Sequence, residues 1–297
     1  MFSVITRSLP IILAGSLGYA ISLHGDAYIF DIGGVLASSN KIRSFRELGI
    51  VNILQYFVTV RRGPNAIKRT FFETLNRVAK EHKISRRPGR TIAKDDSGKP
   101  VPLLMNLWLT GKITCEKLRT MIFESIDKHP EWFDYEIEKR LIHNLVDMVF
   151  TPEKFIKTIQ LNKEIITFAK QCKQQGHQIY ILSNWDAESF ELLKQKDPAF
   201  FASFDGIIIS GQTGQVKPGK KIFKTLLKKY HLKPRNCFFI DDQKENVATS
   251  RKLKICGILC RSSHSWLEKK PDLRYVLQEI ARAQQAKNTV ATAVRFV

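Results

Sequence analysis

The chain has 297 residues, of which 43% are hydrophobic and 26% are charged. This length and composition exclude a largely disordered chain and allow one sizeable core with a smaller second unit. The formal net charge of +20 at pH 7 is high, and such a positive field attracts anionic substrates, nucleic acid or anionic lipid. Because the basic residues are spread along the chain rather than gathered in blocks, a solvated lysine-rich surface is the favoured explanation. No recognisable nucleic-acid-binding motif accompanies them.

The cysteines indicate neither a disulfide framework nor a zinc site. Their number is odd and no Cys-x-x-Cys pair occurs among them, the five being Cys115, Cys172, Cys237, Cys256 and Cys260. Structural zinc sites and disulfide scaffolds use paired cysteines at short, regular spacing. We therefore expect buried thiols.

Residues 1–25 differ from the rest of the chain. Arg7 is followed by an apolar stretch, Leu9 to Leu23, which glycines interrupt. The stretch is too short and too rich in glycine for a membrane-spanning helix, but its basic start, apolar middle and small residues are typical of a signal peptide or anchor. The alternative is an extra helix packed on the domain. We expect an exported or membrane-anchored protein in the first case and a cytoplasmic one in the second.

In chain order, the main domain starts with a short strand. Residues 27–30 are apolar and β-prone, and the run stops at Asp31. Gly33 and Gly34 follow and mark a turn. The sequence thus predicts a buried strand that ends in a carboxylate and a tight turn.

Helical periodicity dominates the next part of the chain, from about residue 45 to residue 150. Within it, Thr114 has the position of an N-cap for a helix that begins at Cys115. The polar and basic stretch from Ser85 to Pro102 is rich in proline and glycine, so it is predicted to be a loop.

Beyond residue 160, helices and strands alternate. The predicted helices cover 163–174, 188–194, 220–230 and 246–253, and the predicted strands cover 178–182, 206–209, 237–240 and 256–259. This alternation predicts an α/β fold with a Rossmann-like, doubly wound parallel sheet. The first strand belongs to the same sheet, so the helical part before residue 153 is predicted to be an inserted helical cap.

Four polar clusters follow strands or a strand-to-helix connection: Asp31-Ile32-Gly33-Gly34, Ser183-Asn184, Lys217-Pro218 and Asp241-Asp242. In a parallel sheet the ligand crevice lies at the carboxyl ends of the strands, so the clusters should meet there. Carboxylates, a hydroxyl and a lysine suit metal-assisted phosphoryl transfer better than a serine or cysteine triad. Each cluster alone is typical of an ordinary turn or helix cap, and it is their occurrence together, in order, that indicates a site.

In order and context these clusters resemble the motifs of the haloacid dehalogenase (HAD) superfamily. The resemblance covers about residues 27–259 and is carried by the four segments Phe30–Leu36, Ile181–Asn184, Lys217–Phe223 and Phe239–Asp242, with Asn246 four residues after the last. The variant is most similar to the branch that contains sugar-phosphate phosphatases and the phosphatase domains joined to epoxide hydrolases. Trp108–Thr114 also resembles a cap segment of that branch.

The resemblance implies a division of the chain. Residues 26–40 and 153–265 would form the catalytic core, and residues 41–152 the helical cap. Residues 1–25 would be the signal or anchor segment. The remaining residues, 266–297, are predicted to be a helical tail that carries no motif.

The resemblance also implies a nucleophile and a cofactor. Asp31 would attack the phosphate ester and bind Mg²⁺, which prefers oxygen ligands. Asp242 and the main-chain carbonyl of Gly33 would complete the metal site. Asp241 and Asn246 would support the site without touching the substrate.

The phosphate would be held by three neighbouring groups, according to the same resemblance. Ser183, Asn184 and Lys217 would bind its oxygens, and Lys217 would also contact Asp31. Asp31, Ser183 and Lys217 are thus the predicted catalytic residues. The lysine and the metal would reduce the repulsion between two anions.

One position departs from the family pattern. Many family phosphatases carry a second aspartate two residues after the nucleophile, which protonates the leaving group, and here that position is Gly33. Dehalogenases of the superfamily also lack this acid, but they do not need a metal, and the pair Asp241-Asp242 argues for one. We therefore expect one of three things: slow turnover, a substrate with a good leaving group, or a proton donor from the cap. Gly219 also stands where an acidic residue is common.

These observations favour a Mg²⁺-dependent phosphatase that acts on a small phosphorylated metabolite. The alternatives are a metal-independent dehalogenase-type hydrolase and a catalytically weak domain that serves as a binding module. We expect no specific binding of nucleic acid, and contact with a membrane only through the N-terminal segment. The oligomeric state stays open.

Overall fold

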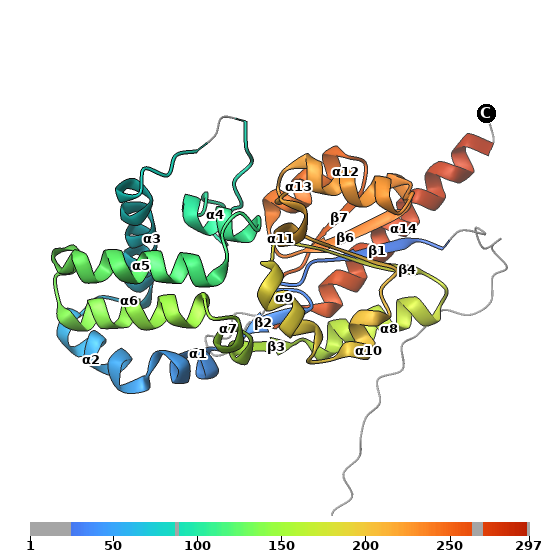
Figure 1. Ribbon diagram of the computed structural model, residues 1–297. Coiled ribbons are helices and arrows are strands. Elements are labelled where there is room, and N and C mark those ends of the chain that lie inside the picture. Colours follow the sequence, from blue (N-terminus) through green and yellow to red (C-terminus); the bar gives the residue numbers. More distant parts are fainter. Residues whose placement is uncertain (1–24, 87–88, 263–269, 296–297) are drawn as a thin grey trace, which may run out of the picture.

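The computed structural model describes residues 25–86, 89–262 and 270–295, which form a sheet-based core and a helical cap beside it (Figure 1). The predicted signal or anchor segment, residues 1–25, lies outside the described residues apart from its last position. None of the helices within the described ranges is long and apolar enough to cross a membrane.

The core is built on a five-stranded parallel sheet of order β5-β4-β1-β6-β7. Its strands are β1 (Ala27–Phe30), β4 (Gln178–Ser183), β5 (Gly206–Ile209), β6 (Cys237–Asp241) and β7 (Cys256–Leu259). Continuous apolar runs form these strands because a parallel sheet is covered on both faces. The predicted α/β fold with a doubly wound sheet is confirmed.

Successive residues of β1 point to opposite faces of the sheet. Tyr28 and Phe30 belong to one hydrophobic cluster, and Ala27 and Ile29 belong to another. The first face is covered by α8 (Lys163–Gln174), α9 (Ala187–Lys194), α10 (Pro198–Ala202) and α14 (Leu273–Arg295). The second is covered by α12 (Lys220–Lys229). The remaining elements of the core are α11 (Ser210–Thr213), the 3₁₀ helix η2 (Pro234–Asn236) and α13 (Lys244–Lys252).

The C-terminal tail contains the predicted helix, α14, and its first half packs on the core. Val276 and Ile280, four positions apart on one helical face, are buried in the same hydrophobic cluster as Phe30. The sequence carried no motif that indicated this packing.

The cap has hydrophobic clusters of its own. It comprises α1 (Lys41–Leu48), α2 (Ile50–Val60), α3 (Pro64–Glu81), α4 (Leu103–Leu109), α5 (Cys115–Lys128), η1 (Pro130–Trp132) and α6 (Glu136–Val149). Thr114 caps α5 as predicted, since its side chain accepts a hydrogen bond from the Lys117 N–H at 3.2 Å. The predicted loop, Ser85 to Pro102, contains no helix in its described residues.

Two short antiparallel strands join the cap to the core. They are β2 (Ala37–Ser39) and β3 (Ile159–Leu161), and α7 (Pro152–Thr158) precedes the second of them. In Figure 1 these elements lie between the two bodies. Sequence analysis missed the strands because each is only three residues long and partly polar.

The five cysteines are free. Four are buried, as expected, and Cys256 is half-buried. No disulfide or zinc site formed by cysteines is present in the described part of the chain.

Candidate active site

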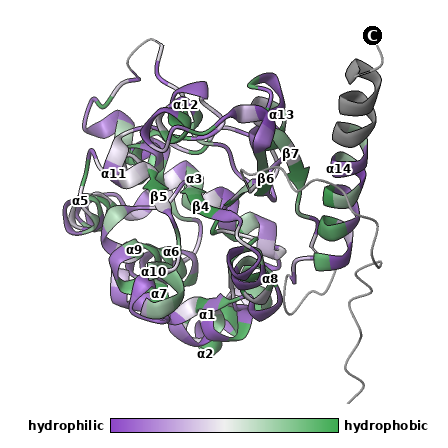
Figure 2. Ribbon diagram, turned by 90° about the vertical axis from the view of Figure 1, so that its right-hand side faces the viewer, coloured by the Kyte–Doolittle hydropathy of each residue, from purple (hydrophilic) through white to green (hydrophobic). Residues whose placement is uncertain are grey.

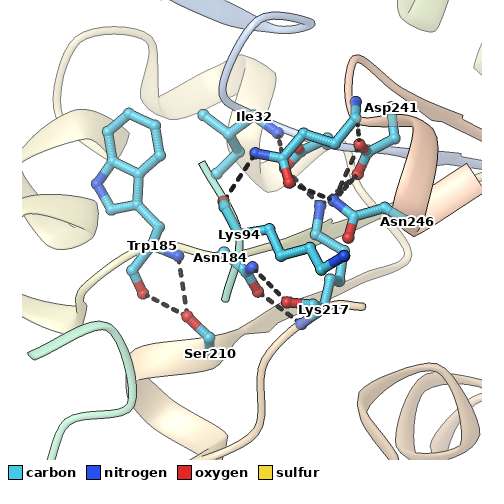
Figure 3. Close-up of polar contacts among 10 residues, drawn as sticks. Ile32, Lys94, Asn184, Trp185, Ser210, Lys217, Asp241 and Asn246 are labelled. Carbon is cyan, nitrogen blue, oxygen red and sulfur yellow. Dashed lines mark hydrogen bonds and ion pairs between the residues drawn. The ribbon is translucent and has the colours of Figure 1, made fainter. Parts of the chain in front are cut away.

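Asp31 lies at the carboxyl end of the central strand, where the polar clusters of the sequence converge. Its main-chain N–H donates to the Ile240 carbonyl at 2.9 Å, which extends the pairing of β1 with β6 by one residue. Its Oδ1 accepts a hydrogen bond from the Ile32 N–H at 2.7 Å (Figure 3). The side chain is 6% exposed, so the carboxylate is held in place but still reachable.

Lys217 is a buried cation between two carboxylates. Its side chain is fully buried, and Nζ lies 2.8 Å from Asp31 Oδ1 and 2.6 Å from Asp241 Oδ2. Burial lowers the pKa of Lys217, but the charges and hydrogen bonds of Asp241 and Asp31 outweigh it and the net shift is upward. The lysine is therefore protonated at neutral pH.

Asn184 holds the main chain of Lys217. The Lys217 N–H donates to Asn184 Oδ1 at 2.8 Å, and Asn184 Nδ2 donates to the Lys217 carbonyl at 2.9 Å. This reciprocal pair ties the end of β4 to the segment that carries the lysine (Figure 3). The side chain thus positions Lys217, and the contact of Asn184 with phosphate stays a prediction.

Asp241 is engaged on both of its carboxylate oxygens. It accepts from the Gln243 N–H at 2.8 Å and from Asn246 Nδ2 at 3.0 and 3.1 Å, in addition to Lys217. These contacts fix the carboxylate that faces the lysine. Gln243 was missed by sequence analysis, where its position directly after the acidic pair was the one available signal.

Asp31, Asp241 and Asp242 form a cluster in which one carboxylate oxygen of each lies within 4.8 Å of the others. Burial raises the pKa of Asp242 to about 8, and the charges of Asp241 and Asp31 add to this effect. Burial also raises the pKa of Asp241, to about 6, although Lys217 opposes the shift. Three crowded carboxylates against one buried lysine favour a further cation.

This cluster fits Mg²⁺, which binds carboxylate and carbonyl oxygens. Asp241 is occupied by Lys217, Gln243 and Asn246, so Asp31 and Asp242 are the carboxylates left to hold an ion. The predicted third ligand, the carbonyl of Gly33, belongs to the turn that directly follows Asp31.

The two glycines of that turn have different environments. Gly34 has φ +71°, and a Cβ atom there would lie 2.3 Å from Asp242 Oδ2. A Cβ atom at Gly33 would meet no atom within 4 Å among the described residues. Gly34 therefore lets the turn approach Asp242, whereas the position of Gly33 has room for a side chain.

Ser183, the last residue of β4, has a buried hydroxyl without a partner. Its side chain is 1% exposed, and Oγ finds no hydrogen-bond partner among the described residues. An unsatisfied buried hydroxyl costs about 1–3 kcal/mol. An oxygen of a bound anion would satisfy it, which is the role predicted for this residue.

The basic loop of the cap reaches the core beside the site. The Lys94 carbonyl accepts a hydrogen bond from Gln243 Nε2 at 3.3 Å (Figure 3), and Ala93 and Val101 pack against Val216. The charge of Asp96, at the tip of this loop, contributes to the raised pKa of Asp242. The sequence predicted a loop here but not that it lies against the site.

A second part of the cap is held against the strand ends. Ser210 Oγ donates to the Leu109 carbonyl at 2.6 Å and accepts from the Trp185 N–H at 3.0 Å. A Cβ atom on Gly111 would lie 2.2 Å from the Gly211 carbonyl oxygen. The segment that resembles a family cap motif, Trp108–Thr114, is therefore in close contact with the core.

Comparison with known proteins identifies the fold family. The family model for haloacid dehalogenase-like hydrolases matches residues 26–254. A HAD family enzyme from Bacteroides thetaiotaomicron has a similar structure, with a TM-score of 0.50 and 15% sequence identity over 82% of this chain and 97% of that protein. At this identity the similarity concerns the fold alone.

Two curated relatives are bifunctional epoxide hydrolases 2. The rat protein (Rattus norvegicus) is 30% identical and the mouse protein (Mus musculus) 25% identical, each over 162 residues, or 54% of this chain. Each alignment covers 28% of the relative, so this chain spans little more than a quarter of their length. The predicted resemblance to epoxide-hydrolase-linked members of the superfamily is confirmed.

We predict that Mg²⁺ stabilises the protein through Asp242. Saturating Mg²⁺ should raise the melting temperature by roughly 5 °C or more. The pKa of Asp242 is raised from its usual 3.8 to about 8, so the metal-free fold holds a proton there that the unfolded chain has lost. Its contribution to the stability is therefore full below pH 3.8, falls as pH rises from 3.8, and is gone above pH 8. The proton competes with the ion, so the gain from Mg²⁺ should be larger at pH 9 than at pH 6. Thermal melts at both pH values measure it.

Asp242→Asn should remove most of this gain. Asp134→Asn is the control, because Asp134 pairs with Arg62 on the surface of the cap. An equal Mg²⁺ effect in Asp242→Asn and in the wild type would contradict the assigned ligand.

We predict opposite outcomes for the same substitution at the two glycines. Gly34→Ala should weaken Mg²⁺ binding at least about tenfold, because its Cβ enters the space of Asp242 and its φ is unfavourable for alanine. Gly33→Ala should change the affinity little, since its Cβ meets no described atom. Calorimetric titration with Mg²⁺ compares the two, and equal losses would rule out the contact with Asp242 as the reason.

Proposed function

The chain belongs to the haloacid dehalogenase-like hydrolases, and we propose that it is a Mg²⁺-dependent phosphatase that acts on a small phosphomonoester through Asp31. The observation that carries this proposal is the buried Lys217 paired with Asp31, which itself has a carboxylate oxygen within 4.8 Å of one of Asp242. An anionic substrate needs such a cation, and a second acidic residue next to the nucleophile is of use mainly when a metal ion is bound.

The contacts of Asp31 suggest which oxygen attacks. Oδ1 is held by the Ile32 N–H and by Lys217 Nζ, which leaves Oδ2 to approach the phosphorus. This oxygen forms a bond to phosphorus while the bond from phosphorus to the ester oxygen breaks, and the leaving alcohol takes up a proton. Water then hydrolyses the phosphoryl-aspartate, which releases phosphate and restores Asp31.

The neighbouring groups bind the phosphoryl oxygens. The unpartnered hydroxyl of Ser183 donates to one of them, and Lys217 reduces the repulsion between the aspartate and the phosphate dianion. Asp241 and Asn184 keep the lysine in place from its two ends. Mg²⁺ bound by Asp31, Asp242 and the Gly33 carbonyl would supply further positive charge at the transferring group.

The proton for the leaving alcohol has no donor at the position of Gly33. General acid-base help contributes typically about 10²–10⁴-fold in rate, so we expect slow turnover of poor leaving groups and faster turnover of aryl phosphates. Asp96 is an acidic residue of the cap loop, and its charge contributes to the raised pKa of Asp242. It is therefore our candidate for a donor from the cap.

A metal-independent dehalogenase remains the second candidate, because Gly33 fits it as well. In that case Asp31 would attack carbon instead of phosphorus, and Asp242 would have no metal ion to bind. Chloride release from a haloacid without Mg²⁺ would identify it.

We predict that hydrolysis of an aryl phosphate depends on Mg²⁺ and is lost in Asp31→Asn. The amide is neutral and cannot act as the nucleophile, so the rate should fall at least about a thousandfold. A chelator should have a similar effect on the wild type. A folded Asp31→Asn variant that keeps its rate would exclude Asp31 as the nucleophile.

We predict that Gly33→Asp raises the kcat for an alkyl phosphate by about tenfold or more. The reason is that the new side chain has room beside the nucleophile and would protonate the leaving oxygen. Gly33→Asn is the matched control of similar size without an acid.

Asp96→Asn should lower kcat for the alkyl phosphate more than for the aryl phosphate, and no difference between the two substrates would remove Asp96 as a donor.

A further inference from the structure

The outer side of the cap presents an apolar surface made by α1 and α2. Six of the eight exposed large hydrophobic residues in the described part of the chain lie on these two helices. We call this surface the outer face; its residues are Ile42, Phe45, Ile50, Val51, Leu54 and Val58, and they are between 40% and 76% exposed. Figure 2 shows hydrophobic positions on α2 at the lower edge of the molecule. Such concentration on two consecutive helices indicates a binding surface rather than scattered exposure.

Helix α2 is apolar on two opposite sides. Ile53 and Tyr56 are buried in a cluster with residues of α6, whereas Val51, Leu54 and Val58, at the spacing i, i+3 and i+7, point away from it and are exposed. A helix that covers a core on one side normally carries polar residues on the other. The outer face of α2 is therefore suited to being covered.

Basic residues lie directly beside the apolar ones. Ile42 and Arg46 are four positions apart and share a side of α1. Arg46 also lines a surface hollow of about 370 Å³, together with Arg43, Glu47, Lys157 and Lys196. Four cations around one carboxylate form a site suited to anions such as phosphate groups.

We propose that the outer face docks on an anionic lipid bilayer, with its aliphatic side chains at the boundary of the acyl region and the basic hollow against lipid phosphates. Exposed aliphatic side chains on a surface helix can enter the membrane interface, and basic side chains next to them gain from anionic headgroups. This surface extends the membrane contact expected from the sequence, which was confined to the N-terminal segment.

The charge of the outer face favours an anionic bilayer over two other binding partners, a second copy of the chain and the segment of residues 1–24. A second copy of the chain in a twofold dimer would bring the basic residues of the outer face against themselves. The apolar segment of residues 1–24 contains no aspartate or glutamate, so it offers nothing to the basic hollow. An anionic bilayer complements the aliphatic and the basic parts together.

Docking by the outer face leaves the active site accessible. In Figure 1, α1 and α2 lie at the lower edge of the cap, on the side away from α4 and the loop that precedes it. That loop contacts the core beside Lys217. A membrane-bound molecule can therefore still take substrate from solution or from the bilayer surface.

The test is co-sedimentation of the full chain with vesicles of phosphatidylcholine, with and without phosphatidylserine. The wild type should bind the anionic vesicles and not the neutral ones. The triple variant Val51→Ser, Leu54→Ser, Val58→Ser should bind at least about tenfold more weakly. Leu277→Ser, a change at an exposed leucine on α14, is the control and should bind like the wild type.

A second pair of variants tests the hollow. Arg43→Gln with Arg46→Gln should weaken binding about fivefold for each charge removed, whereas Lys224→Gln with Lys228→Gln on α12 should have a smaller effect. Unchanged melting temperatures show that the variants are folded. Equal binding by the triple variant and the wild type, as expected if residues 1–24 are the sole anchor, would overturn the proposal. A wild-type dimer that the triple variant converts to a monomer would also overturn it.

Discussion

A fully buried ammonium group needs negative partners, and the rest of the site is arranged around the partners of Lys217. Asp31 and Asp241 lie within 2.8 Å of its Nζ, at the carboxyl ends of the adjacent strands β1 and β6. Breaking a buried ion pair by removing one partner costs about 3–5 kcal/mol, so Asp31 and Lys217 fix each other. The same pairing leaves Asp242 with a surplus of negative charge around it. The demand for a metal ion thus follows from the way in which the lysine is neutralised.

The order of the strands in the sheet places these groups side by side although they are far apart in the sequence. β1 lies between β4 and β6, so the residues after these strands share the carboxyl edge of the sheet. The cap also contacts this edge of the sheet. Its basic loop packs on Val216, next to Lys217, and Ser210 holds the end of α4. In the function proposed above, the core would supply the chemistry and the cap would limit access to it.

Short apolar runs in the sequence correctly predicted strands whose conformation is determined locally. The strands 206–209 and 256–259 have the predicted bounds, because short apolar runs between turns have few other conformations. Contacts between distant segments had no such signal: β2 and β3 are too short, and the packing of Ala93 on Val216 joins residues far apart in the chain. The different tasks of Gly33 and Gly34 were also hidden, since only the fold brings Asp242 against one of them. The polar clusters were identified, but the structure was needed to reveal that Asn184 holds the backbone of Lys217.

We propose above that Asp31 becomes phosphorylated beside a metal ion held by Asp242. A crystal structure with Mg²⁺ and beryllium trifluoride, which mimics a phosphoryl group on aspartate, tests it most directly. We expect the fluoride group on Oδ2 of Asp31, within hydrogen-bonding distance of Ser183 and Lys217, and the ion on Asp31, Asp242 and the Gly33 carbonyl. An ion bound elsewhere, or no adduct on Asp31 at saturating ligand, would contradict it.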